Sequence, residues 1–449
     1  MLATLGWITL GIAVAVWSIV LLNRLSVDTA EGVVGERRTD LTVRSVIFLS
    51  WLYSVAPPLV GLMQLGRQGN KIGTPTTVTP LAAHLATGLS AAIALLCLRL
   101  LLDNAAGRAS STFGYLAAFL APWLAIEAVG GAAAGYASAR QMLLYPLVAL
   151  AFWLACPSIR VISTLGVLTI ITAGFSLMFA LVSPLGLVNA GPAGTDKAIV
   201  GSGPNLLAGP YNHANSLGLS LALGLPSIAV LSSRRLRVAG VTMVALALLW
   251  TASRTSILAG AVVLLVYAAT RRRTVRALRS VSAVSIVVGI ALGVATPLLE
   301  QNPTAFSSRG AIWMASLSNW HRHLWFGSGP QFYERPNDLG FYALYGHNLM
   351  VDTLARGGLV ALAALVIYFL SLTRRAMTLA NLTSYPLLLL VAFVYVSWLE
   401  VPFDLNNLGI LGYACWIPFA VLAFTRDAPN ADLHARATTP AADQIATAA

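Results

Sequence analysis

The sequence predicts an all-α fold, a polytopic bundle of about 12 to 13 transmembrane helices. Composition is the first reason: 57% of the residues are hydrophobic and 10% are charged, with a mean hydropathy of +0.78, whereas a soluble domain is about a quarter charged. Apolar runs of about 20 residues also recur from Leu2 to Phe424. These runs are continuous, which excludes the alternating strands of a membrane barrel. Because backbone groups cannot stay unpaired in hydrocarbon, such runs must be helices.

The apolar runs give the expected spans in order along the chain. They are residues 2–22, 45–65, 81–102, 112–131, 142–156, 161–182, 214–231, 238–251, 256–270, 280–299, 350–372, 383–399 and 407–424. The first run has no basic segment before it and no clear cleavage site after it, so it is expected to be a retained span and not a signal peptide. Residues 1–425 are therefore expected to form one polytopic membrane domain.

Basic residues give the orientation of these spans. The net charge is +12, but the Lys and Arg residues form short clusters between apolar runs, which is typical of topogenic arginines and not of a nucleic-acid surface. Placing the loop 23–44 in the cytoplasm puts 19 of the 28 Lys and Arg residues there. The tail, residues 426–449, is then cytoplasmic, and its Ala- and Thr-rich composition predicts disorder.

Two long loops are expected on the outer face, residues 183–212 and 300–346. The first is rich in Gly, Pro and Asn. The second has apolar residues near helical spacing, which predict an amphipathic helix lying on the bilayer interface. These are Ile312, Trp313, Leu317, Trp320 and Leu324. The Gly-Ser-Gly-Pro turn at 327–330 is expected to end that helix.

Two arginines on the outer side need an explanation, because positive residues are normally retained in the cytoplasm. Arg254 lies in a tight turn between two apolar runs, and Arg309 lies just before the interfacial helix. A guanidinium offers two parallel donors to phosphate oxygens, so two of them suit a diphosphate. The alternatives are that Arg254 reaches lipid headgroups and that Arg309 is an ordinary surface residue.

His347 stands in a Gly-His-Asn sequence at the point where the second loop re-enters the membrane. An imidazole there can accept a proton from a sugar hydroxyl or donate a hydrogen bond to a departing phosphate. The alternative is a histidine that caps or packs at a helix entrance. Asp352 and Arg356 follow at helical i and i+4 spacing and are expected to pair with each other.

Three amide and imidazole residues are expected to bind substrate near the same surface. His213 and Asn215 lie in Gly-Pro-Tyr-Asn-His-Ala-Asn at the start of a span, where such groups either bind sugar hydroxyls or cap the helix. Asn348, directly after His347, is the third.

Acidic residues are fewer on this side. Glu127 lies in the outer half of the fourth span, where an unpaired carboxylate is costly. It is expected to pair with an outer arginine or to serve as an acceptor-site base. Glu400 and Asp404, at the outer end of a later span, are expected to be solvated.

Several patterns are missing from the sequence. No Asp-x-Asp pair is present to hold a divalent ion on a diphosphate, so no metal ligands are predicted and charge neutralisation falls to arginine. No Walker-type loop is present, which argues against ATP hydrolysis, and no cofactor is predicted. Cys97, Cys156 and Cys415 lie inside apolar runs without Cys-x-x-Cys spacing, so neither a disulfide framework nor a metal knuckle is expected.

In their order, these elements resemble the bacterial O-antigen ligase and O-antigen polymerase family of membrane glycosyltransferases. The elements are Tyr-Asn-His-Ala-Asn at 211–215, Thr-Ala-Ser-Arg-Thr at 251–255, the segment 308–330 from Ser-Arg to Phe-Gly-Ser-Gly-Pro, and Gly-His-Asn at 346–348 with Gly-Gly at 357–358. They define a family-like core of residues 183–372, with the expected catalytic loop at 300–346.

The resemblance implies a metal-independent transferase of the GT-C type, in the bacterial plasma membrane, whose active site faces away from the cytoplasm. It implies a polyprenyl-diphosphate-linked glycan donor, with Arg254 and Arg309 on the diphosphate and His347 on the acceptor or the leaving group. The acceptor would be a hydroxyl on a lipid, a wall polymer or a glycan. Membrane lipids are expected as partners, and nucleic acid is not. A single displacement would invert the anomeric carbon.

Three alternatives remain open on the sequence. A polymerase of the same family would extend a second carrier-linked glycan, and the sequence does not separate it from a ligase. A transporter of anions or solutes would also contain charged residues among its helices, but here they gather at the outer face and not at midplane, and no inverted repeat is visible. The third is a membrane scaffold for envelope assembly.

Overall fold

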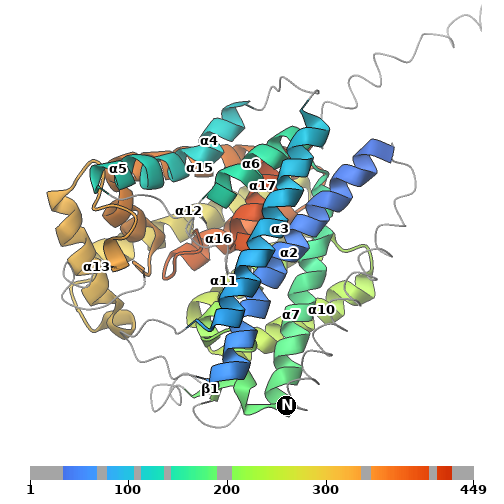
Figure 1. The fold of residues 1–449 in the computed structure, drawn as a ribbon, viewed down its shortest axis with the longest axis horizontal. Helices are drawn as coiled ribbons and strands as arrows, with labels where there is room; N and C mark the ends of the chain where they lie inside the picture. The colour runs from blue at the N-terminus through green and yellow to red at the C-terminus, as the bar shows by residue number, and fades with distance from the viewer. Residues whose placement is uncertain are drawn as a thin grey trace, which may run out of the picture.

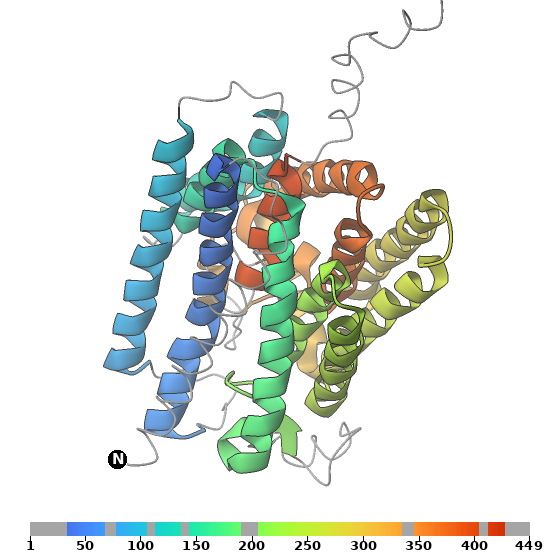
Figure 2. The same cartoon turned by 90° about the vertical axis from the view of Figure 1, so that its right-hand side faces the viewer.

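The computed structural model describes residues 34–67, 78–105, 113–135, 143–189, 205–334, 345–403 and 412–426. These residues form an almost entirely helical bundle (Figures 1 and 2), which confirms the predicted all-α class. The sheet found among them is one antiparallel pair, β1 (Leu187–Asn189) and β2 (Asn205–Leu207), with Leu187 opposite Leu207. The expected span 2–22 and the predicted disordered tail beyond residue 426 lie outside the described residues.

The first half of the bundle is built on α2 (Val34–Leu65), α3 (Pro80–Asn104) and α7 (Ser163–Val182), which run side by side in both views (Figures 1 and 2). Thr79 caps α3 by accepting a hydrogen bond from the backbone N–H of Ala82 (3.3 Å), so the helix begins where the apolar run begins. The shorter elements of this half are α4 (Phe113–Trp123), the π-helical η1 (Leu124–Gly130), α5 (Gly131–Ala133), α6 (Leu144–Ala155) and the 3-10 turn η3 (Ile159–Ile162).

The remaining expected spans lie on helices in the second half of the bundle. Its elements are η4 (Pro184–Gly186), α9 (Ala214–Gly224), η5 (Leu225–Val230), α10 (Arg234–Thr251), α11 (Arg254–Thr270), α12 (Val275–Leu299), α13 (Ala305–Arg322), η6 (Phe332–Glu334), α15 (Leu349–Leu379), α16 (Tyr385–Ser397), η7 (Gly412–Trp416) and α17 (Ile417–Phe424). Two spans change helix type at a proline, Pro226 in η5 and Pro418 in α17, because proline has no N–H to donate.

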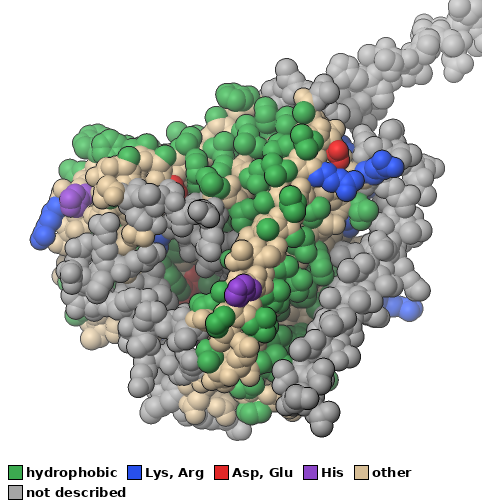
Figure 3. Space-filling view, viewed as in Figure 1, with side chains coloured by type: hydrophobic (Ala, Val, Ile, Leu, Met, Phe, Trp, Pro, Cys, Tyr) green, Lys and Arg blue, Asp and Glu red, His purple; other side chains and the backbone are tan. Residues whose placement is uncertain are grey.

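Six helical stretches of the described residues are long and apolar enough to cross a membrane. They are Arg38–Leu65, Pro80–Asn104, Phe113–Ala133, Ile159–Val182, Val275–Leu299 and Leu349–Leu379. Large apolar side chains face outward on the flanks; Leu102 on α3 is 79% exposed and Leu299 on α12 is 77% exposed. In Figure 3 hydrophobic side chains spread over the visible face, and most of the visible Lys and Arg side chains lie at its margins. Such a surface suits lipid as the solvent.

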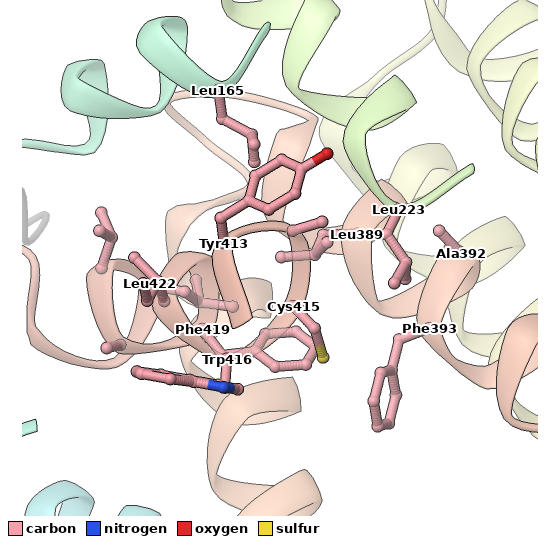
Figure 4. Close-up of a cluster of buried hydrophobic side chains, with 14 of the residues drawn as sticks. Leu165, Leu223, Leu389, Ala392, Phe393, Tyr413, Cys415, Trp416, Phe419 and Leu422 are labelled. Atoms are coloured by element: carbon pink, nitrogen blue, oxygen red, sulfur yellow. The ribbon is translucent and has the colours of Figure 1, made fainter. Parts of the chain in front are cut away.

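The interior of the bundle is apolar and aromatic. Figure 4 shows one cluster, where side chains of α7, α9, α16, η7 and α17 meet, with Trp416 only 1% exposed. Phe393 and Phe419 pack edge to face with ring centroids 5.1 Å apart. At Gly224 an added Cβ would lie 2.2 Å from the hydroxyl of Thr169, so the missing side chain lets α9 approach α7. This packing fixes α16, and with it the polar residues at the C-terminal end of α16.

Helix α15 is kinked at Gly358, where φ is +64° and ψ is −157°. Because of the kink, the N–H groups of the two residues after Gly358 do not donate to carbonyls of the same helix. They donate instead to carbonyls of the loop after α13. Leu359 donates to the carbonyl of Leu324 (2.9 Å) and Val360 donates to the carbonyl of Trp325 (3.1 Å). A Cβ on Gly358 would lie 2.4 Å from the carbonyl carbon of Trp325, so only glycine fits this contact.

The Gly-Ser-Gly-Pro turn at 327–330 does not end the amphipathic helix, so that prediction is wrong. The predicted helix itself is present as α13, but it ends at Arg322, before the turn. The turn binds instead to the kink in α15, where Ser328 N–H donates to the carbonyl of Ala355 (2.8 Å). Gly327 has φ of +63°, a left-handed conformation that brings the loop against α15.

Candidate active site

Glu400 lies one turn beyond α16 and is the centre of a buried polar cluster. It is 1% exposed, so the prediction that it is solvated is wrong. The chain continues in a helical turn here, with Glu400 N–H donating to the carbonyl of Val396 (3.0 Å). Trp398 ties the same turn to α12 through a hydrogen bond to the hydroxyl of Thr296 (2.7 Å). Asp404, predicted to be solvated with Glu400, lies outside the described residues.

Four side chains contact the Glu400 carboxylate. Arg309 Nη2 donates to Oε1 at 2.5 Å, and Asn215 Nδ2 donates to the same oxygen at 3.4 Å. The hydroxyl of Tyr345 donates to Oε2 at 3.0 Å, and Nδ1 of His347 lies 3.5 Å from Oε2. Three residues predicted for the site, Arg309, His347 and Asn215, are thus brought together by the fold from positions far apart in sequence.

The cluster keeps Glu400 ionised. Burial alone would raise the pKa of Glu400, but the charge of Arg309 and the contacts with His347 and Tyr345 outweigh burial and lower the pKa from 4.5 to about 2. A buried carboxylate without such partners would be costly. Carboxylate and guanidinium therefore hold each other in place.

The backbone turn at His347 is left-handed, with φ of +48°, a conformation that residues other than glycine seldom adopt. Two hydrogen bonds to the preceding residue hold it. Gly346 N–H donates to the carboxylate of Asp352 (2.8 Å), and the indole N–H of Trp313 donates to the carbonyl of Gly346 (3.0 Å). The imidazole stacks obliquely on Tyr345 with ring centroids 4.2 Å apart, and the side chain of His347 is 23% exposed.

Asn348 connects the turn at His347 to neighbouring elements by hydrogen bonds. Its Oδ1 accepts a hydrogen bond from Val351 N–H (3.0 Å) and so caps α15. Its Nδ2 donates to the carbonyls of Gly293 on α12 (2.8 Å) and of Trp398 (2.9 Å). The side chain is 1% exposed, so in this structure the amide links the turn at His347 to the turn that carries Glu400.

Backbone strain concentrates at the predicted residues. Arg309 follows three consecutive left-handed residues, 306–308, with φ of +52°, +60° and +67°. In the described part of the chain six non-glycine residues have positive φ. Five of them are residues 306–308, His347, and Ala252, which lies two positions before Arg254. Such strain persists only where the surroundings enforce it, and it clusters at functional sites.

Arg254 begins α11, and its side chain is exposed. Its turn packs on α9, where a Cβ on Gly218 would lie 2.9 Å from the Cβ of Ser253. Asn215, which contacts Glu400, lies one turn before Gly218 on the same helix. Arg254 therefore lies at the same end of the bundle as the Glu400 cluster, although among the described residues it is not one of the side chains that contact Glu400.

Comparison with known proteins assigns a family to the part of the chain that carries these residues. Residues 238–366 match the family model described as O-antigen ligase. This segment belongs to the O-antigen ligase family. The family predicted from the sequence is thereby confirmed, and together with the apolar helices it supports a multi-pass membrane enzyme of the O-antigen ligase and polymerase type. A search of curated proteins found no match to the chain.

The O-antigen ligase segment contains some of the site but not all of it. Arg254, Arg309 and His347 lie inside it. Asn215 precedes the segment and Glu400 follows it. The flanking helices α9 and α16 therefore complete the cluster. In Figure 1 α13 (orange) lies at the left-hand end of the molecule, close to α15.

Two predicted substrate-binding residues, His213 and Glu127, are not among the side chains found in contact with Glu400 in the described part of the chain. His213 is exposed and caps α9, its Nδ1 accepting a hydrogen bond from Asn215 N–H (3.0 Å). Glu127 is 2% exposed within η1, which packs on the kinked part of α15. Near that contact, a Cβ on Gly130 would lie 3.2 Å from the carbonyl oxygen of Arg356.

Asp352 and Arg356 pair with each other, as predicted. Arg356 Nε lies 3.1 Å from Asp352 Oδ2. The guanidinium also donates to the carbonyl of Pro330 (3.2 Å) and lies over the ring of Tyr333, 5.3 Å from its centroid. Asp352 uses its other oxygen to hold Gly346. The pair therefore links the turn at 327–330 to the turn at His347.

Arg67 is a residue that the sequence interpretation missed. It follows α2 directly, and its guanidinium donates to the backbone carbonyls of Leu185, Gly209, Tyr211 and Asn212. It thereby fixes the Tyr-Asn-His-Ala-Asn segment that starts α9. Burial lowers the pKa of Arg67 to about 10. The rule that singled out Arg254, a basic residue on the predicted outer side, applies equally to Arg67 and could have found it.

Proposed function

We propose that this chain transfers a glycan from a polyprenyl-diphosphate-linked donor to an acceptor hydroxyl at the outer face of the membrane. Arg254 and Arg309 bind the diphosphate, and His347 accepts the proton of the acceptor. The observation that carries the proposal is that Arg309 and His347, from separate elements, meet at one buried carboxylate. A cation suited to phosphate and a base suited to a hydroxyl are therefore adjacent.

The reaction is a single displacement at the anomeric carbon. The acceptor oxygen forms the new bond to that carbon as its proton passes to His347. The bond from the anomeric carbon to the phosphate oxygen breaks, and its electron pair leaves with the carrier diphosphate. The configuration is inverted. Because negative charge grows on the departing oxygen, the guanidinium groups of Arg254 and Arg309 supply the main stabilisation.

The surroundings of the cluster favour an anionic substrate. Three helices begin here: α9 beside Asn215, α11 at Arg254 and α15 beside His347. The first turn of a helix presents N–H groups without helical partners and a partial positive charge, which attract phosphate. Among the described residues, the guanidinium of Arg309 donates to Glu400 through Nη2, and in this proposal its other N–H groups donate to the diphosphate.

We assign the other predicted residues to substrate contacts around this centre. His213 and Asn215, at the start of α9, would donate to sugar hydroxyls of the donor. Asn348 would support His347 by fixing its turn. Glu127, buried beside the kink in α15, would serve the acceptor side. Arginine charge takes the place of a metal ion in this proposal, and we expect transfer to persist in the presence of a chelator.

A transfer assay with purified protein and carrier-linked glycan tests the assignment. For Arg254→Ala and Arg309→Ala we expect the rate to fall on the order of 10²-fold to 10³-fold, and for His347→Ala on the order of 10²-fold to 10⁴-fold. Arg234→Ala is the matched control, because Arg234 is an exposed arginine at the start of the neighbouring helix α10. Folded Arg254, Arg309 and His347 variants that keep full turnover would refute the assignment.

The same assay separates a ligase from a polymerase. A ligase delivers one glycan to a lipid, wall-polymer or other acceptor and gives a single product. A polymerase extends a second carrier-linked glycan and gives a ladder of products. We propose the ligase-type reaction, and a ladder formed from the donor alone would assign the chain to polymerisation instead.

A further inference from the structure

The contact between Glu400 and Nδ1 of His347 has no part in the reaction as written above. The two atoms, Oε2 and Nδ1, lie 3.5 Å apart. Nδ1 is buried and, among the described residues, has no hydrogen-bond partner, although 23% of the side chain of His347 is exposed. The exposed part of the ring is therefore not Nδ1. One ring nitrogen faces a carboxylate, and Nε2 remains for the substrate.

We propose that Glu400 is a positioning residue that keeps the proton of neutral His347 on Nδ1 and leaves Nε2 as the base that meets the acceptor hydroxyl. This inference rests on the function proposed above and deepens it. An ionised carboxylate can only accept hydrogen bonds, so the nitrogen facing it must donate. Neutral imidazole has one N–H, so the lone pair is then on Nε2.

The surroundings hold both partners in this arrangement. Arg309 and Tyr345 fix the carboxylate of Glu400 by hydrogen bonds, and the left-handed turn fixes the backbone of His347. At 3.5 Å the contact is longer than a normal hydrogen bond. Catalytic hydrogen bonds are often long without substrate and tighten when it binds, and we expect the same here.

The charged and titratable groups around His347 come from several elements. Glu400 follows α16, Arg309 belongs to α13, and Tyr345 precedes His347 in the loop. Asp352 on α15 lies behind Gly346 and is paired with Arg356. Of these, Glu400 is the anion in contact with the imidazole. Removing its charge therefore removes the group that selects the Nδ1 proton.

The first test is the kinetics of transfer in Glu400→Gln. A glutamine amide can offer either its NH₂ group or its oxygen to Nδ1, so it no longer requires Nδ1 to carry the proton. We expect kcat per folded molecule to fall on the order of 10²-fold, with a smaller change in KM. A structural role alone would lower the active fraction and leave kcat per folded molecule unchanged.

Two further variants keep the test decisive if Glu400→Gln misfolds. Glu400→Asp keeps the charge on a shorter side chain, and we expect a smaller loss of kcat than in Glu400→Gln. Asp103→Asn removes a carboxylate from an exposed pair with Arg99 on α3 and is the control, with the rate unchanged. Wild-type rates in both Glu400 variants would overturn the inference.

A second measurement does not depend on transfer. The chain has six histidines, and ¹⁵N-histidine spectra compared with those of His347→Ala identify the signals of His347. We expect the neutral ring to carry its proton on Nδ1 in wild type and to lose that preference in Glu400→Gln. A wild-type ring protonated on Nε2 would refute the inference even if transfer occurs. Conversely, an Nδ1 proton in a chain without transferase activity would refute the proposed function alone.

Discussion

Two guanidinium–carboxylate pairs lie close together at one end of this molecule, and they differ in sequence separation and in what else they contact. Asp352 and Arg356 are four residues apart on α15. Arg309 lies on α13, whereas Glu400 follows α16, 91 positions later in the chain. Both pairs are largely buried: the arginine side chains are 10% and 13% exposed and the carboxylate side chains 8% and 1%.

The difference lies in what else each pair contacts. Arg356 is held by Asp352, by a backbone carbonyl and by the ring of Tyr333, all of which are fixed parts of the fold. Arg309 is held by the carboxylate of Glu400, which also contacts the candidate base His347. The local pair therefore holds two turns together, whereas the long-range pair joins the proposed phosphate-binding group to the candidate base. Proximity and burial alone do not distinguish these roles.

Loss of Arg309 is the largest change we expect. Arg309→Ala leaves the Glu400 carboxylate buried without its main counter-charge, which costs about 3 kcal/mol or more of stability. It also removes a group that we propose binds the leaving diphosphate. We expect a lower midpoint of thermal unfolding in detergent together with a loss of transfer.

The double variant Arg309→Ala with Glu400→Gln separates the two effects. Without the buried charge, most of the stability is expected to return, because neither partner is left as an uncompensated ion. Transfer is not expected to return. A single Arg309→Ala variant as stable as wild type would show that the long-range pair contributes nothing to the fold.

Loss of charge in the local pair is expected to have a different signature. Asp352→Asn keeps an oxygen for Gly346 N–H but weakens the interaction with Arg356, at a cost of about 2 kcal/mol. Turnover per folded molecule is expected to stay within about tenfold of wild type, because no substrate group is involved. A large loss of kcat at an unchanged unfolding midpoint would mean that this pair also takes part in the chemistry.

Acidification is expected to weaken the long-range pair selectively. The pKa of Glu400 is lowered from 4.5 to about 2 in the folded protein. A carboxyl of this kind contributes stability that is complete above its ordinary pKa and is lost as the pH falls through the folded-state value. The difference in unfolding midpoint between wild type and Glu400→Gln is therefore expected to shrink between about pH 5 and pH 2. A difference that stays constant over this range would contradict the assignment of charge.

The fold was largely predictable because one physical rule governs it. Continuous apolar runs in hydrocarbon must be helices, and every expected span that falls on described residues overlaps a helix. Local features were also predictable, including the amphipathic helix α13 and the Asp352–Arg356 pair, since both depend on helical spacing alone. The end of α13 was not, because the turn at 327–330 is placed by the kink in α15 and not by its own sequence.

The site was predictable only in part, and for the same reason. Arg309 and His347 stand out because charge and imidazole on the predicted outer side need an explanation. Glu400 did not stand out, since a carboxylate at the end of a span is normally solvated and nothing near it in sequence indicates burial. Its partners are brought to it by packing between α9, α12, α13 and α16. Tyr345 was missed in the same way, because its role depends on the position of Glu400.

The smallest expected effect concerns Asn215, whose amide either supports Glu400 of the long-range pair or binds a sugar hydroxyl. Its amide donates to Glu400 over 3.4 Å and is only partly buried, so Asn215→Ala is expected to cost less than about 1 kcal/mol of stability. If the amide mainly supports Glu400, kcat falls slightly and KM for the donor is unchanged. If it mainly binds a sugar hydroxyl, KM for the donor rises more than kcat falls. We expect the rise in KM, because the strong hydrogen bonds from Arg309 and Tyr345 already fix the carboxylate.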